Sequence, residues 1–305
     1  MKKVMVLMGG MSSERDISLL SGTNVARALK DAGYAVVTYD LTANLADFIQ
    51  TLRQEKPDVV FNALHGKYGE DGCIQGLLDM MSVPYTHSGV LASSIGMNKA
   101  MARHLVQQIG ISVAKGGLMT RQEFIADEPA MPYVIKPNDN GSSVGVTIVR
   151  NEADRDEVLS RWPDEQQLLV EAYIPGKELS VAVLDGKALG VVEIVPKTGY
   201  YDFQNKYTTG GAAHIIPAPI DQNIYAQAMK YAEQVHHLIG ARGVTRSDFR
   251  LDDTNTKSPR LVFLEINTGP GMTALSLVPD IAKTCCGLTY EELVSHLVEE
   301  ATCDT

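Results

Sequence analysis

Apolar stretches alternate with amphipathic stretches through the first third of the chain. Residues 2–8 are apolar and rich in strand-forming types, and a helical pattern follows. The apolar side of that helix is expected to consist of Ile17, Leu20, Val25, Ala28 and Leu29, with Gly33 as its stop. A strand over 35–39, a helix over 45–53 and a strand over 58–62 come next. Such alternation predicts a parallel sheet with right-handed crossovers.

The rest of the chain changes character and contains more hairpin patterning. The expected elements are a helix over 98–109, strands over 132–136 and 144–149, a helix over 151–161, a strand over 167–171, paired strands over 178–184 and 188–195, a helix over 221–239, and strands over 244–252 and 260–267 before two final helices. The irregular stretch 196–213 is long enough to suggest a functional loop. We therefore expect an α/β fold that becomes α+β in its later lobes.

Composition places the chain among ordinary globular proteins. It has 305 residues, 45% hydrophobic and 21% charged, with a formal net charge of −10. The length allows two or three domains, and the acidic balance argues against a nucleic-acid partner. No apolar run approaches the roughly 18 residues of a membrane span. A faint likeness to a signal peptide at the start is cut short by the polar residues 12–16, so a buried first strand is the better interpretation.

The four cysteines indicate a reduced compartment. Cys285 and Cys286 are adjacent, Cys73 and Cys303 are isolated, and none belongs to a CxxC motif. A cytoplasmic protein is the expectation, with all four thiols taken as packing or surface residues.

The strongest chemical signal comes from two neighbouring strands near the C-terminus. A hairpin over 244–267 centred between 256 and 257 would place Asp248 opposite Glu265, with Asn267 on the same face. Two carboxylates and an amide oxygen form a set of hard ligands that suits Mg²⁺. The alternative is a solvated sheet face, which the apolar surroundings of Glu265 disfavour.

A glycine- and serine-rich loop follows the strand that ends at Lys136. The loop runs from Pro137 to Gly145, and its backbone N–H groups could close over phosphates while lysine supplies charge. It lacks the GK[ST] helix start of a Walker A loop. Lys99 and Lys206 could add charge, although a single lysine is more often a surface residue.

Two further junctions carry polar groups at places where ligands bind. After Asn267, a glycine-rich turn with Gly271 leads to a helix expected to begin near Ser276, and Arg246 lies on the facing strand. A helix start can hold a carboxylate, and a turn N–H beside arginine can stabilise an oxyanion. Glu14 follows the first strand, where helix capping is the simpler interpretation. No GxGxxG motif accompanies it, which argues against a dinucleotide site. His65 opens a charged, glycine-rich loop after the third strand.

Together these segments resemble the D-alanine–D-alanine ligase family of ATP-grasp enzymes, nearly end to end. The segments that carry the resemblance are Gly9-Gly10-Met11-Ser12-Ser13-Glu14-Arg15, Leu64-His65-Gly66, Lys136 to Gly145, Lys206-Tyr207, Arg246-Ser247-Asp248 and Glu265 to Thr273. Each is suggestive alone, and their joint occurrence in order is specific. The resemblance implies an ATP-grasp fold behind an N-terminal Rossmann-like domain, with divisions at 1–94, 95–178 and 179–305.

The resemblance also assigns the nucleotide site. It implies ATP with two Mg²⁺ ions, for which Mn²⁺ could substitute, held by Asp248, Glu265 and Asn267. The residues implied for the nucleotide itself are Lys99, Lys136, Ser142, Ser143, Glu171, Tyr173, Ile174, Glu178, Lys206 and Leu264.

The substrate site follows from the same resemblance. Glu14, Ser142 and Tyr207 would form a hydrogen-bonded trio that closes a loop and orients the first D-alanine, with His65 nearby. Arg246 and Gly271 would stabilise the oxyanion. Ser276 and the N–H of Leu277 would bind the second D-alanine.

The implied product is D-alanyl-D-alanine for peptidoglycan synthesis, made through an acyl phosphate by a homodimer. Leu275 departs from the family, several of whose members carry histidine there. Depsipeptide-forming relatives often have Phe at the position of Tyr207, so tyrosine favours an amine acceptor over D-lactate. A non-catalytic nucleotide sensor and an NAD-linked dehydrogenase are the other interpretations, and the retained Arg246 and the missing glycine fingerprint disfavour them.

Overall fold

The first 80 residues form the predicted parallel sheet with helices packed on it. The computed structural model describes residues 1–141, 145–196, 211–273 and 276–304. The elements of the first unit are β1 Lys3–Gly9, α1 Arg15–Asp31, β2 Ala35–Leu41, α2 Leu45–Glu55, β3 Val59–Asn62 and α3 Cys73–Met80. The strand order is β2-β1-β3 and both pairings are parallel. The central strand β1 is buried for most of its length, which explains the apolar run over residues 4–8.

Helix α1 buries most of the predicted face but not all of it. Val25, Ala28 and Leu29 are buried as predicted, whereas Leu20 was expected in the core and is 51% exposed. The buried stripe instead includes Ser18, Ser21 and Gly22, and a Cβ at Gly22 would stand 2.5 Å from the Cβ of Met8. Because the helix approaches β1 this closely, small residues occupy its inner face and the larger leucine points outward.

Two short helices connect this unit to the rest of the chain. They are α4 Val90–Met97 and α5 Lys99–Gln108, which meet at Asn98. The Asn98 side chain accepts a hydrogen bond of 3.0 Å from the N–H of Met101 and so caps the start of α5. The cap fixes the position of Lys99, the first residue of α5.

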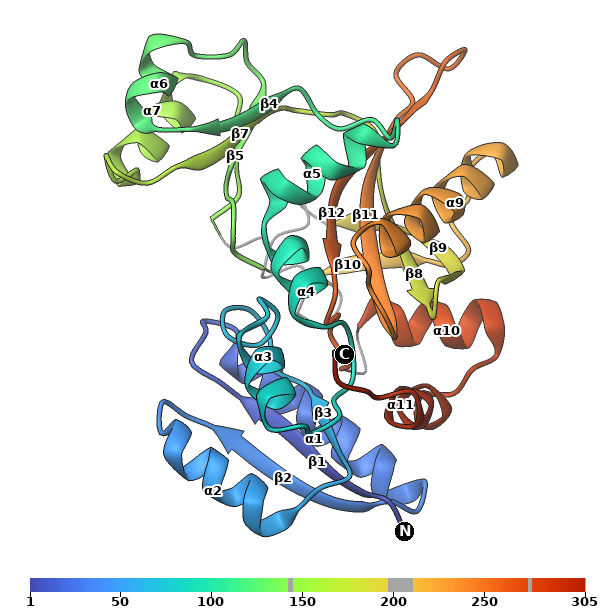
Figure 1. The fold of residues 1–305 in the computed structure, drawn as a ribbon. Helices are drawn as coiled ribbons and strands as arrows, with labels where there is room; N and C mark the ends of the chain where they lie inside the picture. The colour runs from blue at the N-terminus through green and yellow to red at the C-terminus, as the bar shows by residue number, and fades with distance from the viewer. Residues whose placement is uncertain (142–144, 197–210, 274–275, 305) are drawn as a thin grey trace.

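The middle unit is an antiparallel sheet with two helices. Its elements are β4 Gly116–Met119, α6 Arg121–Ala126, β5 Tyr133–Pro137, β6 Thr147–Val149, α7 Glu152–Arg161 and β7 Leu168–Ala172, with strand order β4-β7-β5-β6. It stands apart from the first unit, above α5 in Figure 1. Phe124, Tyr133 and Trp162 form its aromatic core.

The C-terminal unit is a five-stranded antiparallel sheet between helices. Its elements are β8 Lys177–Leu184, β9 Lys187–Pro196, β10 Ala212–Ile215, α9 Gln222–Leu238, β11 Val244–Asp252, β12 Arg260–Asn267, α10 Leu277–Cys286 and α11 Tyr290–Glu299, with strand order β10-β9-β8-β11-β12. Val181 and Val183 pack in one cluster with α9, whereas Ala182 packs in another with α10. This alternation covers both faces of the sheet.

The N-terminal and C-terminal units share one core. Val25 of α1 and Val294 of α11 belong to the same buried cluster, and Figure 1 shows α11 beside the parallel sheet. Tyr85 pairs with Thr302 at the end of the chain. No helix among the described ranges is long and apolar enough to cross a membrane.

Candidate active site

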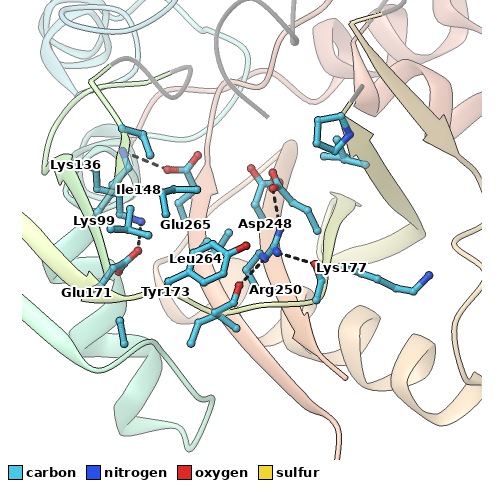
Figure 2. A pocket seen from close by; sticks show the side chains of 18 of the residues that line it. Lys99, Lys136, Ile148, Glu171, Tyr173, Lys177, Asp248, Arg250, Leu264 and Glu265 are labelled. Atoms are coloured by element: carbon cyan, nitrogen blue, oxygen red, sulfur yellow. Dashed lines mark hydrogen bonds and ion pairs between the residues drawn. The ribbon is translucent and has the colours of Figure 1, made fainter. Parts of the chain in front are cut away.

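A cavity of about 370 Å³ lies between the middle and C-terminal sheets and collects most of the predicted nucleotide residues (Figure 2). Nine predicted residues line it: Lys99, Lys136, Glu171, Tyr173, Ile174, Glu178, Asp248, Leu264 and Glu265. They come from α5, β5, β7, β8, β11, β12 and the segment after β7. Residues up to 166 positions apart in the sequence, Lys99 and Glu265, are therefore brought to one cavity.

Two of the lysines that line the cavity, Lys99 and Lys136, are buried and paired with carboxylates. Lys99 Nζ lies 3.2 Å from Glu265 Oε2 and donates a 2.6 Å hydrogen bond to the carbonyl of Asn140. Lys136 Nζ lies 2.6 Å from Glu171 Oε1. Both ammonium groups are thus held at the cavity wall, where they can attract a polyanion.

The hairpin that carries the predicted metal ligands has the expected pair but a different turn centre. Asp248 faces Glu265 as predicted, whereas Asp252 faces Arg260, which centres the turn on residue 256. A β-bulge lies between Asp248 and Phe249 and leaves Leu264 without a partner. Because the bulge interrupts the alternation of β12, the adjacent residues Leu264 and Glu265 both line the cavity.

The surroundings of these ligands fit a divalent cation. Asp248 receives a 2.5 Å hydrogen bond from Ser180 and an ion pair of 2.9 Å from Arg246. Asn267, opposite Arg246, has a buried side-chain nitrogen with no partner among the described residues. The unpartnered nitrogen is a hydrogen-bond donor and would not itself bind a cation, but the two carboxylates and the amide oxygen of Asn267 form a set of hard oxygen ligands that suits such an ion. Within the described ranges, no three His, Cys, Asp or Glu side chains gather as a metal cluster.

Arg250 organises the segment after β7 and was missed in the sequence. Its guanidinium donates to the carbonyls of Ile174, at 3.1 Å, and Gly176, at 2.6 Å. It also lies 3.3 Å from Glu178 Oε2. The position of Arg250 two residues after Asp248 on one strand face was the signal that could have identified it.

Two smaller hollows adjoin the cavity at Asn140, which borders all three. One of them contains Glu265 and Asn267, and the other contains Glu14. The predicted nucleotide, metal and first-substrate regions are therefore neighbours.

Glu14 does not cap helix α1, contrary to the simpler interpretation. It occupies the N-cap position but makes no side-chain cap hydrogen bond and is 5% exposed. A Cβ at Gly141 would stand 2.5 Å from Glu14 Oε1, and one at Gly66 would stand 3.0 Å from it. The carboxylate thus reaches across to the loop of the middle unit, where only glycine leaves room for it.

Two titratable groups in the same region as Glu14, His65 and Glu70, have strongly shifted pKa values. Burial, assisted by the charge of Arg246, lowers the pKa of His65 to about 4. His65 Nε2 lies 3.0 Å from the hydroxyl of Ser21, and its ring also bonds to the backbone of Gly269. Desolvation and the nearby Glu14 carboxylate raise the pKa of Glu70 to about 8. His65 is therefore neutral at pH 7, and its hydrogen bond to Gly269 stabilises the glycine-rich turn after β12.

The glycine-rich turn leads to α10 as predicted. Ser276 is the N-cap residue and Leu277 the first helical residue. The Ser276 hydroxyl accepts a 2.9 Å hydrogen bond from the N–H of Thr273, and a Cβ at Gly271 would stand 2.9 Å from it. The Ser276 side chain makes no cap hydrogen bond, so it does not occupy the N–H groups at the start of α10.

Some predicted residues lie outside the described ranges. They are Ser142, Ser143, Lys206 and Tyr207, together with the unusual Leu275.

Comparisons with known proteins agree with this arrangement. Residues 91–299 match the family described as D-ala D-ala ligase C-terminus, and residues 3–56 and 44–88 match D-ala D-ala ligase N-terminus. The D-alanine–D-alanine ligase of Paramagnetospirillum magneticum is 51% identical, with 99% of each chain covered. That of Rhodospirillum rubrum is 49% identical with the same coverage.

Solved structures give the same relationship. A crystal structure of the D-alanine–D-alanine ligase from Bacillus anthracis is similar with a TM-score of 0.83, at 29% identity over 98% of this chain and 97% of that one. A second, complexed with ATP, has a TM-score of 0.81 at 28% identity, covering 98% and 96%. With two family matches spanning the chain and relatives near half identity, this chain belongs to the D-alanine–D-alanine ligase family of ATP-grasp enzymes.

Proposed function

We propose that the chain joins two D-alanine molecules into D-alanyl-D-alanine while ATP is converted to ADP and phosphate. The observation that carries this is the 51% identity to a D-alanine–D-alanine ligase across 99% of both chains. The gathering of seven predicted nucleotide residues and two predicted metal ligands around one cavity supports it. The D-lactate alternative is not favoured, because the relatives are named as D-alanine ligases.

The first step activates a carboxylate. The carboxylate of the first D-alanine attacks the γ-phosphorus of ATP, the bond to the β-phosphate oxygen breaks, and an acyl phosphate forms with ADP. Lys99 and Lys136 neutralise charge at the phosphates. Asp248, Glu265 and Asn267 would hold Mg²⁺ or Mn²⁺, which supplies further charge neutralisation at the transferred group. The adenine base lies between Tyr173, Ile174 and Leu264, with Glu171 at its edge. Glu178 binds the ribose.

The second step forms the peptide bond. The amine of the second D-alanine attacks the acyl carbon and loses a proton, and phosphate leaves with the C–O bond electrons and can take up that proton. Arg246 and the Gly271 N–H stabilise the oxyanion, and the start of α10 at Ser276 and Leu277 binds the second carboxylate. Glu14 orients the first D-alanine, while His65 acts through the turn that it braces.

Other roles belong to residues outside the described ranges. Ser142 and Ser143 would contact phosphate, and Lys206 and Tyr207 would cover the intermediate and exclude water, since an exposed acyl phosphate hydrolyses. We further propose a cytoplasmic homodimer that supplies peptidoglycan precursors.

Phosphate release with ATP, Mg²⁺ and either D-alanine or L-alanine tests the function. We expect release with D-alanine alone and a D-alanyl-D-alanine product. Mixtures of D-alanine and D-lactate then separate peptide from depsipeptide synthesis. Release without any dipeptide, or equal release with L-alanine, would contradict the proposal.

A further inference from the structure

A buried arginine that does not line the cavity contacts one of its key side chains. Arg103, on α5, is 5% exposed. Its NH1 lies 3.1 Å from Glu171 Oε2, and its NH2 donates a short hydrogen bond to the carbonyl of Ala114. A buried guanidinium is costly unless it is paired and hydrogen-bonded. The two terminal nitrogens are paired and hydrogen-bonded, whereas Nε has no partner among the described residues. The ion-pair partner is a residue of the nucleotide cavity.

Glu171 is held from two sides. Lys136 lies 2.6 Å from one carboxylate oxygen and Arg103 lies 3.1 Å from the other. Glu171 is 4% exposed and lines the cavity. A carboxylate has about four lone-pair sites, so two cationic partners leave acceptor capacity for a ligand N–H. Because a cation occupies each oxygen, the carboxylate is kept as an acceptor of fixed orientation.

Helix α5 links the two ends of the cavity. Lys99 and Arg103 are four residues apart and therefore lie on one face of the helix. Lys99 pairs with Glu265 at the metal-ligand end, and Arg103 pairs with Glu171 at the other end. One rigid turn of helix thus sets the spacing between the two carboxylates.

The end near Glu171 has the character of a base pocket. Val134 and Ile148 of the middle sheet and Leu264 of β12 line the cavity from opposite sheets, and residues 172–174 line it as well. A flat aromatic base fits between apolar walls. Adenine presents an exocyclic amine at position 6, which a carboxylate accepts, whereas guanine presents a carbonyl there, which a carboxylate repels.

We propose that Arg103 is a positioning residue that sets nucleobase selectivity, by fixing Glu171 as an acceptor for the exocyclic amine of adenine. The proposal rests on the proposed function only in taking ATP as the nucleotide. Arg103 itself does not touch the ligand. A site built to hydrogen-bond a ligand group discriminates strongly against an analogue that lacks it, because a buried polar group is then left unpaired.

The test compares Arg103→Met and Arg103→Lys with wild type and with Gln107→Ala, an exposed position on the same helix. ADP and GDP binding are measured by calorimetry without D-alanine, so no step of ligation is involved. For Arg103→Met, we expect ADP affinity to fall about tenfold and the ADP-to-GDP preference to shrink by a similar factor, as for loss of a charged hydrogen bond. Arg103→Lys restores part of the preference, and Gln107→Ala changes neither value.

Steady-state kinetics supply a second measurement. Arg103→Met should raise KM for ATP with kcat changed by less than about threefold, since the reacting end of the site is intact. Folding is checked by circular dichroism and thermal unfolding. An Arg103→Met or Arg103→Lys protein that folds, binds ADP more weakly and yet keeps the wild-type ADP-to-GDP ratio would show a purely structural arginine and overturn the proposal. Unchanged ADP and GDP affinities in both variants would overturn it equally. Failure of wild type to make dipeptide, with ADP binding intact, would instead refute the proposed function.

Discussion

Replacing Glu265 by glutamine tests the predicted metal site most directly. The substitution keeps the shape of the side chain and removes its charge. In the structure, that charge is opposed by Lys99 at 3.2 Å, and the two side chains are 19% and 8% exposed. At an effective dielectric constant of about 20, this pair attracts by roughly 5 kcal/mol before the cost of desolvation is subtracted.

The net cost to folding should be much smaller than this attraction. Glutamine still offers Lys99 a carbonyl oxygen, and Lys99 keeps its hydrogen bond to Asn140. We therefore expect Glu265→Gln to lose about 1–2 kcal/mol of unfolding free energy. The rate should fall by about 10²–10³-fold, because charge neutralisation at the transferred phosphoryl group is lost.

Phosphate release measured against Mg²⁺ concentration is the assay, with urea unfolding beside it. Asp252→Asn is the matched control, since Asp252 lies in the same hairpin and pairs with Arg260 at 3.1 Å, outside the cavity. The control should leave the Mg²⁺ dependence unchanged. Full turnover of Glu265→Gln at the wild-type Mg²⁺ concentration would refute the metal assignment.

Three further changes probe other parts of the structure. Gly141→Ala puts a methyl group 2.5 Å from Glu14 Oε1, so KM for D-alanine should rise about tenfold with ADP binding unchanged. Gly117→Ala, at a position with open space around it, is the control and should leave KM unchanged. Equal KM values for the two variants would contradict the placement of Glu14. Phe249→Ala empties a fully buried site and should cost about 3–5 kcal/mol in urea unfolding, and a loss below 1 kcal/mol would argue against this core. Burial lowers the pKa of His236 to about 4. Because the unfolded state then binds the proton more tightly than the folded state, the contribution of His236 to the free energy of unfolding is complete above pH 6.5. That contribution falls by about 2–3 kcal/mol as the pH is lowered toward 4. His236→Gln should make that decline shallower, and identical pH profiles would show that His236 does not contribute.

The comparison of sequence and structure is clearest at the β11–β12 hairpin. Strand patterning and a turn-rich connection were enough to predict that Asp248 faces Glu265, because register follows from alternation and turn position. The bulge at Leu264 was not predictable from the same pattern. A bulge depends on how the strand meets its neighbours in the sheet, and no local residue preference marks it.

Helix α1 shows the opposite outcome. Its position and length were readable from periodicity, but its buried face was assigned wrongly at Leu20, which is exposed. The hydrophobic pattern assigns large apolar residues such as Leu20 to the buried face. In the structure, the short distance between α1 and β1 decides which side of the helix can pack against the strand. Gly22 at close range to Met8 determines that choice.

The sequence by itself determined the order of elements, the family, and the residue types that we propose to hold a nucleotide and a cation. These depend on local preferences and on short motifs, which a single chain displays directly. Only the tertiary structure decided the pairing of Arg103 with Glu171 and of Arg250 with the carbonyls after β7. Arg103 and Glu171 are 68 positions apart in the sequence, and Ile174 and Arg250 are 76 positions apart. No local pattern encodes such a meeting. Helix α5 packs against the C-terminal sheet to which β11 belongs, and the middle unit approaches both elements only in the folded chain.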